Sequence, residues 1–149
     1  MFIRDILNLE GSTIFSIAST GTMSDAVRIM VDHDIGSLVV TEGGRMAGML
    51  TFREVLKALD AHGGDMGALQ VGAVMDKDPI CGSPGDSIDQ LREVMTRNHV
   101  RYLPVREGDA LVGLLSFHDV AKAVISESSF ENRLLKRYIK TWPEEESAG

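Results

Sequence analysis

The feature that most constrains the fold of this chain is an internal repeat. A shift of 65 residues aligns residues 38–58, LVVTEGGRMAGMLTFREVLKA, with residues 103–123, LPVREGDALVGLLSFHDVAKA, without a gap, and ten of the 21 positions are identical. Self-similarity of this kind indicates one structural unit used twice, with the two copies packed together to bury a shared core. We therefore expect one unit over residues 1–66, a second over 67–126 and a C-terminal segment over 127–149.

Each copy opens with the same predicted elements. A short extended run, at 14–17 in the first copy and 79–81 in the second, precedes a helix that starts at Thr22 or Ser87. Both of these residues are followed three positions later by an acidic or amide side chain, which is the pattern of a helix N-cap. Apolar residues then recur at helical spacing. Each copy is therefore expected to begin with a strand and a helix.

A hairpin and a second helix complete each copy. The β-rich runs that form the hairpins are 37–41 with 45–50 and 102–106 with 110–115. Glycine at the turn supplies the positive φ that a tight hairpin requires, and the next helix starts at Thr51 or Ser116. The predicted fold class is α/β (α+β), with two strand–helix–strand–strand–helix units.

The segments outside the repeat carry weaker signals. Residues 62–67, His-Gly-Gly-Asp-Met-Gly, are rich in glycine and predict a linker. Ser128 and Glu131 form another helix-cap pattern, and the apolar residues that follow fall on one helical face. We expect a C-terminal amphipathic helix with an acidic tail, which packs on the module or contacts a second copy or a partner.

Charge and composition exclude several classes of function. The net charge of −7 makes nucleic acids and anionic membrane surfaces poor partners, because both are negatively charged. No apolar stretch approaches the ~20 residues that a membrane span needs, and the first residues lack the pattern of a signal peptide. Cys81 is the one cysteine in the sequence, so no intramolecular disulfide forms. We expect a cytoplasmic protein.

Enzymatic and metal sites have little support in the sequence. The histidines at 33, 62, 99 and 118 form no metal-ligand spacing with one another or with Cys81. The sequence contains no P-loop, nucleophile elbow or glycine-rich dinucleotide motif. We expect no catalytic residues, no metal site and no required cofactor. Cys81 is expected to be a small buried residue with no cation beside it to activate its thiol.

One motif occurs in both copies at the start of the second helix: Gly48-Met-Leu-Thr51-Phe-Arg-Glu54 and Gly113-Leu-Leu-Ser116-Phe-His-Asp119. A hydroxyl residue followed three positions later by a carboxylate is an ordinary helix cap. The same geometry also suits a nucleoside phosphate. The helix N-terminus and the hydroxyl can bind phosphate, and the carboxylate can accept hydrogen bonds from ribose hydroxyls.

The repeat unit, the glycine-bounded hairpin and the doubled motif resemble the cystathionine-β-synthase (CBS) domain over about residues 1–125. Met1–Leu7 and Val71–Met75 also resemble the lead-in segment of that family. The resemblance implies a tandem pair of CBS domains related by a pseudo-twofold axis, with two clefts between them. It implies an adenine nucleotide as ligand, either AMP, ADP or ATP, or else NAD or S-adenosylmethionine. It also implies a homodimer.

The resemblance implies that the better cleft is the one that ends in the second copy. Asp119 would hold the ribose hydroxyls and Ser116 the phosphate, with His118 and Arg101 near enough to contact the phosphate. The residues expected around the adenine are Ile14, Phe15, Ile17, Ile35, Gly36 and Ser37.

The resemblance implies a second cleft in which Glu54 replaces the aspartate that is usual in the family. Its extra methylene moves the carboxylate by more than about 1 Å, about enough to spoil a bidentate ribose contact. We expect this site to be weaker, or empty. Its residues would be Thr51, Arg53 and Glu54, with Ile80, Cys81, Val100 and Arg101 from the opposite copy.

The predicted function is therefore regulatory rather than catalytic. The protein would bind an adenine nucleotide and act in trans on an effector protein of unknown identity. The alternative is a non-catalytic dimerisation or interaction module with degenerate ligand sites.

Overall fold

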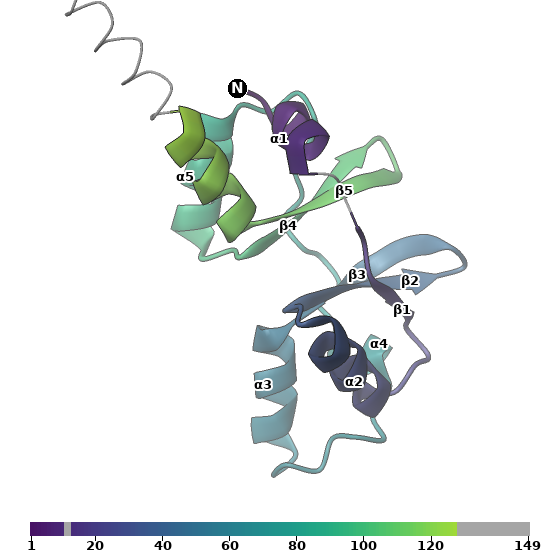
Figure 1. Ribbon diagram of the computed structural model, residues 1–149. Coiled ribbons are helices and arrows are strands. Elements are labelled where there is room, and N and C mark those ends of the chain that lie inside the picture. The colour runs from purple at the N-terminus through teal and green to yellow at the C-terminus, as the bar shows by residue number, and fades with distance from the viewer. Residues whose placement is uncertain (11–12, 128–149) are drawn as a thin grey trace, which may run out of the picture.

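The computed structural model describes residues 1–10 and 13–127, so the predicted C-terminal helix lies outside the described residues. The described chain forms two lobes (Figure 1). In each lobe the strands lie toward the middle of the molecule and the helices lie outside. The mixed α/β class predicted from the repeat is confirmed.

The first repeat contains a three-stranded sheet in the order β1 (Ser16–Ala18), β2 (Ser37–Glu42), β3 (Arg45–Thr51). β1 is parallel to β2, whereas β2 and β3 form an antiparallel hairpin. The hairpin turns at Gly43 and Gly44, both at positive φ, as a tight hairpin needs. Residues 37–40 of β2 are all buried, so both faces of this strand are covered.

Two capped helices cover this sheet. Thr22 precedes α2 (Met23–His33), and its Oγ1 accepts a hydrogen bond from the backbone N–H of Asp25 at 3.1 Å. Thr51 caps α3 (Phe52–Ala61). These contacts satisfy backbone N–H groups that have no partner inside the first helical turn. Both predicted helix starts are confirmed.

The second repeat follows the same order with one difference. It contains α5 (Ile88–Asn98), β4 (Tyr102–Glu107), β5 (Ala110–Ser116) and a helix from 117 to the last described residue, 127. The strand predicted at 79–81 is wrong, because a single parallel bridge joins Gly82 to Val105 in its place. Pro84 has no backbone N–H to donate to β4, and Pro104 of β4 has none to donate to residue 80, so the ladder cannot extend on either side of Gly82.

The two repeats also share irregular features. A β-bulge follows Val40 in the first hairpin and, 65 positions later, follows Val105 in the second. The first helix of each repeat ends in a left-handed residue, Asp34 at φ 52° and His99 at φ 54°. Because these details recur at the spacing of the sequence repeat, the two units have the same local backbone design.

The short lead-in helices are exchanged between the lobes. α1 (Ile3–Glu10) lies in the lobe of β4 and β5, and α4 (Val71–Val74) lies beside α2 (Figure 1). Ile3 and Ile6 are fully buried in one core, together with Leu91, Met95, Leu103, Val105 and Leu115. Val71 is buried in the other core, together with Met23, Leu38, Val40 and Leu50. Each core is therefore built from both sequence repeats.

Candidate functional site

A cavity of about 1140 Å³ lies between the two repeats. Its walls come from the end of α2 and residues 34–36 after it, the end of β3, the start of α3, residues 76–80 and residues 98–102. The apolar residues that line it include Val27, Met30, Ile35, Met49, Val55, Pro79, Ile80 and Val100. A large cavity with apolar walls and a few polar groups is the usual form of a small-molecule site.

Polar groups at the first turn of α3 line the same cavity. The backbone N–H and the hydroxyl of Thr51 both donate to Glu54 Oε1, at 2.8 and 2.7 Å. The N–H of Arg53 donates to Thr51 Oγ1 at 3.2 Å. Glu54 thus turns back onto Thr51 and accepts the hydrogen bond that the hydroxyl donates. The interpretation of this motif as a helix cap is confirmed, and its ligand role stays a prediction.

The equivalent motif in the second repeat is bonded differently. The N–H of Ser116 donates to Asp119 Oδ2 at 2.9 Å, and the N–H of Asp119 donates to Ser116 Oγ at 3.0 Å. Ser116 and Asp119 are half-buried and His118 is exposed, and none of the three lines the 1140 Å³ cavity. The shorter aspartate leaves the serine hydroxyl as an acceptor in the described contacts. That this is the better cleft stays a prediction.

The strand start expected beside the adenine lies partly in the cavity. Ile35 and Gly36 line it. A Cβ on Gly36 would lie 2.0 Å from the hydroxyl of Tyr102 and 2.4 Å from the ring of Phe52. A larger residue here would have to displace two aromatic side chains, one from each repeat, because both approach the Gly36 backbone closely.

The other residues expected around the adenine lie in the first lobe and do not line this cavity. Phe15 and Ile17 pack against the core of the first repeat. Phe15 also stacks on His33, with ring centroids 4.3 Å apart. Ile14 is half-buried and Ser37 is buried. These four residues therefore belong to the packed body of the first lobe and not to the lining of the cavity.

Two aromatic cavity residues, Phe52 and Tyr102, were missed by the sequence analysis. Their rings meet edge to face with centroids 6.3 Å apart. Burial raises the pKa of the Tyr102 phenol above its ordinary value, and the nearby charge of Arg101 acts in the opposite direction. One available signal was a mismatch in the repeat, because Tyr102 stands where the first copy has Ser37.

The charged residues that line the cavity include both signs. The cations are Arg53 and Arg101, which are exposed. The carboxylates are Asp34, Glu54, Asp76 and Asp78. Asp76 exchanges two backbone hydrogen bonds with Met49 of β3, at 2.9 and 2.8 Å, which fixes its position beside the cavity. Asp76 and Asp78 were also missed, because they lie outside the repeated motif.

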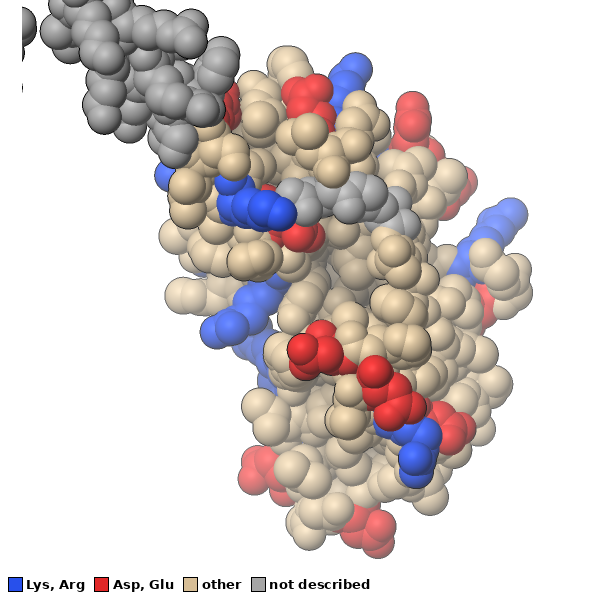
Figure 2. Space-filling model, viewed as in Figure 1, with Lys and Arg blue, Asp and Glu red and all other residues tan. Residues whose placement is uncertain are grey.

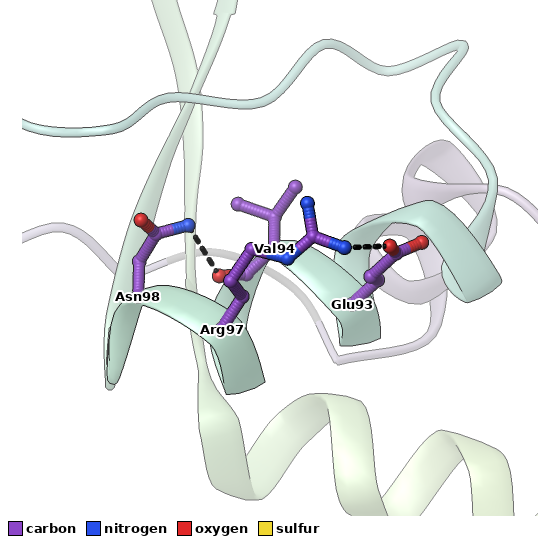
Figure 3. A network of polar contacts seen from close by, with 4 residues as sticks. All are labelled: Glu93, Val94, Arg97 and Asn98. Carbon is purple, nitrogen blue, oxygen red and sulfur yellow. Dashed lines mark hydrogen bonds and ion pairs between the residues drawn. The ribbon is translucent and has the colours of Figure 1, made fainter.

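The end of α5 forms another edge of the cavity (Figure 3). Asn98 lines it and donates from Nδ2 to the carbonyl of Val94 at 2.9 Å. Arg97 points along the helix to Glu93, with which it forms an ion pair. Arg97 is thus already paired with a carboxylate, and Arg101 is the arginine of this region that lines the cavity.

The expectation that no cation lies beside Cys81 is wrong. Arg106, which stands one position after the bulge, interacts with the half-buried thiol. Burial nevertheless raises the pKa of Cys81 above its ordinary value, and the hydrogen bond and positive charge of Arg106 oppose that rise. The thiol also donates to the carbonyl of Pro79 at 3.4 Å. Cys81 does not line the cavity.

Two further properties of the described residues bear on the kind of site. Over residues 1–10 and 13–127, no helix is long and apolar enough to cross a membrane. Acidic and basic side chains are interspersed on the face shown in Figure 2, and its coloured residues form no broad area of lysine and arginine. Such an area is the usual electrostatic mark of a nucleic-acid site.

The duplicated unit, the exchanged lead-in helices and the cavity between the copies define a tandem module with a cavity between its two halves. The family model described as "CBS domain" matches residues 3–61 and again 71–126. The chain therefore belongs to the CBS domain family and contains two such domains.

Known relatives agree with this assignment. The mitochondrial CBS domain-containing protein CBSX3 of Arabidopsis thaliana is 32% identical over 147 residues, covering 93% of this chain and 71% of that protein. A CBS-domain-containing protein from Agrobacterium tumefaciens is 31% identical, with a TM-score of 0.78 over 82% of this chain and 92% of that one.

A third comparison concerns the fold alone. The CBS domain pair of protein MJ0100 is 19% identical and has a TM-score of 0.72, over 85% of this chain and 98% of that one. That structure was solved in complex with 5′-methylthioadenosine and S-adenosyl-L-methionine.

Proposed function

We propose that this protein is a non-catalytic regulatory module that binds an adenine nucleotide in the cavity between its two CBS domains and acts on an effector protein in trans. This proposal departs from the expectation that the cleft of Ser116 and Asp119 is the better one, because Thr51 and Glu54 line the cavity and Ser116 and Asp119 do not. The observation that carries the proposal is the 1140 Å³ cavity itself, which combines apolar walls with the polar first turn of α3. The adenine would lie among the apolar side chains, and the phosphate would lie near Thr51 and Arg53 at the helix N-terminus.

The choice of an adenine-containing ligand has independent support. The solved CBS pair of MJ0100 binds two adenosine derivatives, and it has the same fold as this chain. Both lobes supply residues to the cavity, for example Ile35 from the first and Val100 from the second. A ligand that contacts both would alter the balance of lobe arrangements, which is how binding could be passed to a partner.

The repeat provides matched variants for a test. Thr51→Ala and Ser116→Ala each remove the hydroxyl that caps an equivalent helix, at a comparable cost of about 0.5–2 kcal/mol in stability. We would measure binding of AMP, ADP, ATP, NAD and S-adenosylmethionine to the full chain and both variants by calorimetry. A loss of affinity in Thr51→Ala alone supports the site in the cavity. A loss of affinity in Ser116→Ala alone would place the binding site in the other cleft. No binding of any adenylate at millimolar concentration refutes the proposal.

A dimerisation module is the second candidate, and one observation favours it. Phe52, Leu56 and Leu59 are exposed on one face of α3, with Leu56 63% exposed. In the second repeat, Phe117 and Ile125 are exposed on the equivalent helix. Apolar groups gathered on a surface mark contact sites. Leu56→Glu should convert a dimer to a monomer in sedimentation analysis, and an unchanged mass for this variant would remove this candidate.

A further inference from the structure

We propose that the second cleft of the module, which the motif of Ser116 and Asp119 faces, is closed by an aromatic stack between Phe15 and His33. The protein would then bind one nucleotide per chain rather than two. This inference rests on the proposed function, because it takes the 1140 Å³ cavity to be the nucleotide site. It adds the pair of residues that determines how many sites one chain offers.

The two repeats contact each other reciprocally. A Cβ on Gly48 of β3 would meet the backbone of Asp76, which follows the lead-in segment of the second repeat. A Cβ on Gly113 of β5, the equivalent position, would meet the side chain of Leu7 in the lead-in helix of the first repeat. Each repeat therefore passes along the hairpin of the other. A residue that faces the first cleft has a counterpart, 65 positions away, that faces the second.

This reciprocity identifies the walls of the second cleft. Ile80 and Asn98 of the second repeat line the 1140 Å³ cavity together with the first turn of α3. Their counterparts in the first repeat, 65 positions earlier, are Phe15 and His33. These two aromatic residues therefore belong to the wall that faces the first turn of the helix at 117–127, which carries Asp119.

The two pairs of residues differ in size and in conformation. Asn98 donates from Nδ2 to the carbonyl of Val94 at 2.9 Å, which holds its amide against its own helix (Figure 3). Ile80 is 37% exposed and lines the open cavity. The His33 ring instead stacks on Phe15, with ring centroids 4.3 Å and planes 30° apart. Two stacked rings thus take the place of an amide and an aliphatic side chain.

The lobe itself holds this stack in place. Phe15 is half-buried and packs against the core of the first lobe, and its carbonyl accepts a hydrogen bond from the N–H of Val39 at 3.0 Å. His33 is the last residue of α2 and is exposed, so it covers Phe15 from the solvent side. None of the cavities of about 1140, 480 and 300 Å³ is lined by Phe15, His33 or Asp119.

A nucleotide could enter the second cleft only by displacing the stack. Separating the two rings forfeits an aromatic contact that is worth a factor of about 2–13 in affinity. Moving the Phe15 ring away from the core exposes a large apolar side chain, which lowers the affinity by a further factor of roughly 13 or more. We expect the second cleft to bind nucleotide at least about 30-fold more weakly than the first.

An exchange of the two pairs tests this account in the full chain. Phe15→Ile combined with His33→Asn gives the second cleft the residues of the first. Calorimetry with AMP and, separately, with ATP should find one site per chain in the unmodified protein and two in this variant. Adding Ser116→Ala should weaken only the new site. Two sites of similar affinity in the unmodified protein, or a single site in the folded variant, would overturn the inference.

The reverse exchange keeps the test decisive if the first variant fails to fold. Ile80→Phe combined with Asn98→His replaces two exposed residues and places the aromatic pair in the open cavity. This variant should bind AMP and ATP about 30-fold more weakly, and an unchanged affinity would overturn the inference. If only the Phe15→Ile and His33→Asn variant binds an adenylate, the proposed function fails and this inference stands. If neither it nor the unmodified protein binds, both fail.

Discussion

The exchange of α1 into the second lobe predicts a large and specific loss of stability in Ile6→Ala. Ile6 is fully buried in the core that contains Leu103 and Leu115. The substitution removes three carbon atoms, which are worth about 2.4 kcal/mol at roughly 0.8 kcal/mol per buried CH₂. Incomplete collapse of the resulting cavity adds to this cost. We expect the free energy of unfolding to fall by about 2.5–4 kcal/mol.

Leu9→Ala is the matched control on the same helix. Leu9 is 72% exposed, so its truncation should change stability by no more than about 0.5 kcal/mol. Urea denaturation followed by circular dichroism would give both values. For a chain of this length, the midpoint of thermal unfolding of Ile6→Ala should drop by about 5–16 °C.

Native-state hydrogen exchange would show which lobe the Ile6→Ala substitution destabilises. In Ile6→Ala the amides of β4 and β5 should lose protection before those of β2 and β3, because α1 packs in the lobe of the second repeat. The reasoning is refuted if Ile6→Ala is no more destabilising than Leu9→Ala, or if the first hairpin loses protection first.

Two more predictions concern the equivalent glycines Gly48 and Gly113 and the thiol of Cys81. A Cβ at Gly48 would lie 2.4 Å from the backbone oxygen of Asp76, whereas a Cβ at Gly113 would lie 2.6 Å from the flexible side chain of Leu7. Gly48→Ala should therefore cost about 1–3 kcal/mol and clearly more than Gly113→Ala in the same denaturation assay; equal costs would contradict this account. Because the pKa of Cys81 is raised above its ordinary value of 9.0, its iodoacetamide alkylation at pH 8–9 should be slower in the folded protein than in urea. An alkylation rate in the folded protein equal to that in urea would disprove this shift. As the pH rises, the thiol ionises first in the unfolded chain, so its contribution to stability is present below pH 9 and is lost as the pH rises further.

Local structure could be predicted well from the sequence because the signals for it are local. The hairpin runs at 37–41 and 102–106 each extend one residue further in the structure. The hydroxyl residues predicted to start helices do cap them. Alternation, turn glycines and capping side chains act within a few positions. Because each of these signals occurs in both copies of the repeat, the sequence predicts the corresponding elements twice.

The arrangement of the lobes could not be predicted in the same way. Nothing near Ile3 or Val71 in the sequence indicates which of two similar cores each will join. The absent strand at 79–81 depends on proline positions that the repeat pattern did not weigh. The cavity wall depends on Tyr102 reaching the backbone of Gly36 across the repeat boundary, a contact between residues 66 positions apart. Such features depend on three-dimensional packing rather than on periodicity.

The exchanged position of α1 also matters while the chain is being synthesised. Its partners in the second lobe extend as far as Ala123, so about 110 further residues must be made before the site for Ile3 and Ile6 is complete. At roughly 5–20 residues per second, that interval lasts about 5–20 seconds. During that time the apolar face of α1 is open to chaperones, and it can dock on the finished second lobe of a neighbouring chain. The contact that unites the two repeats in one molecule is thus also the one through which two nascent molecules can become entangled.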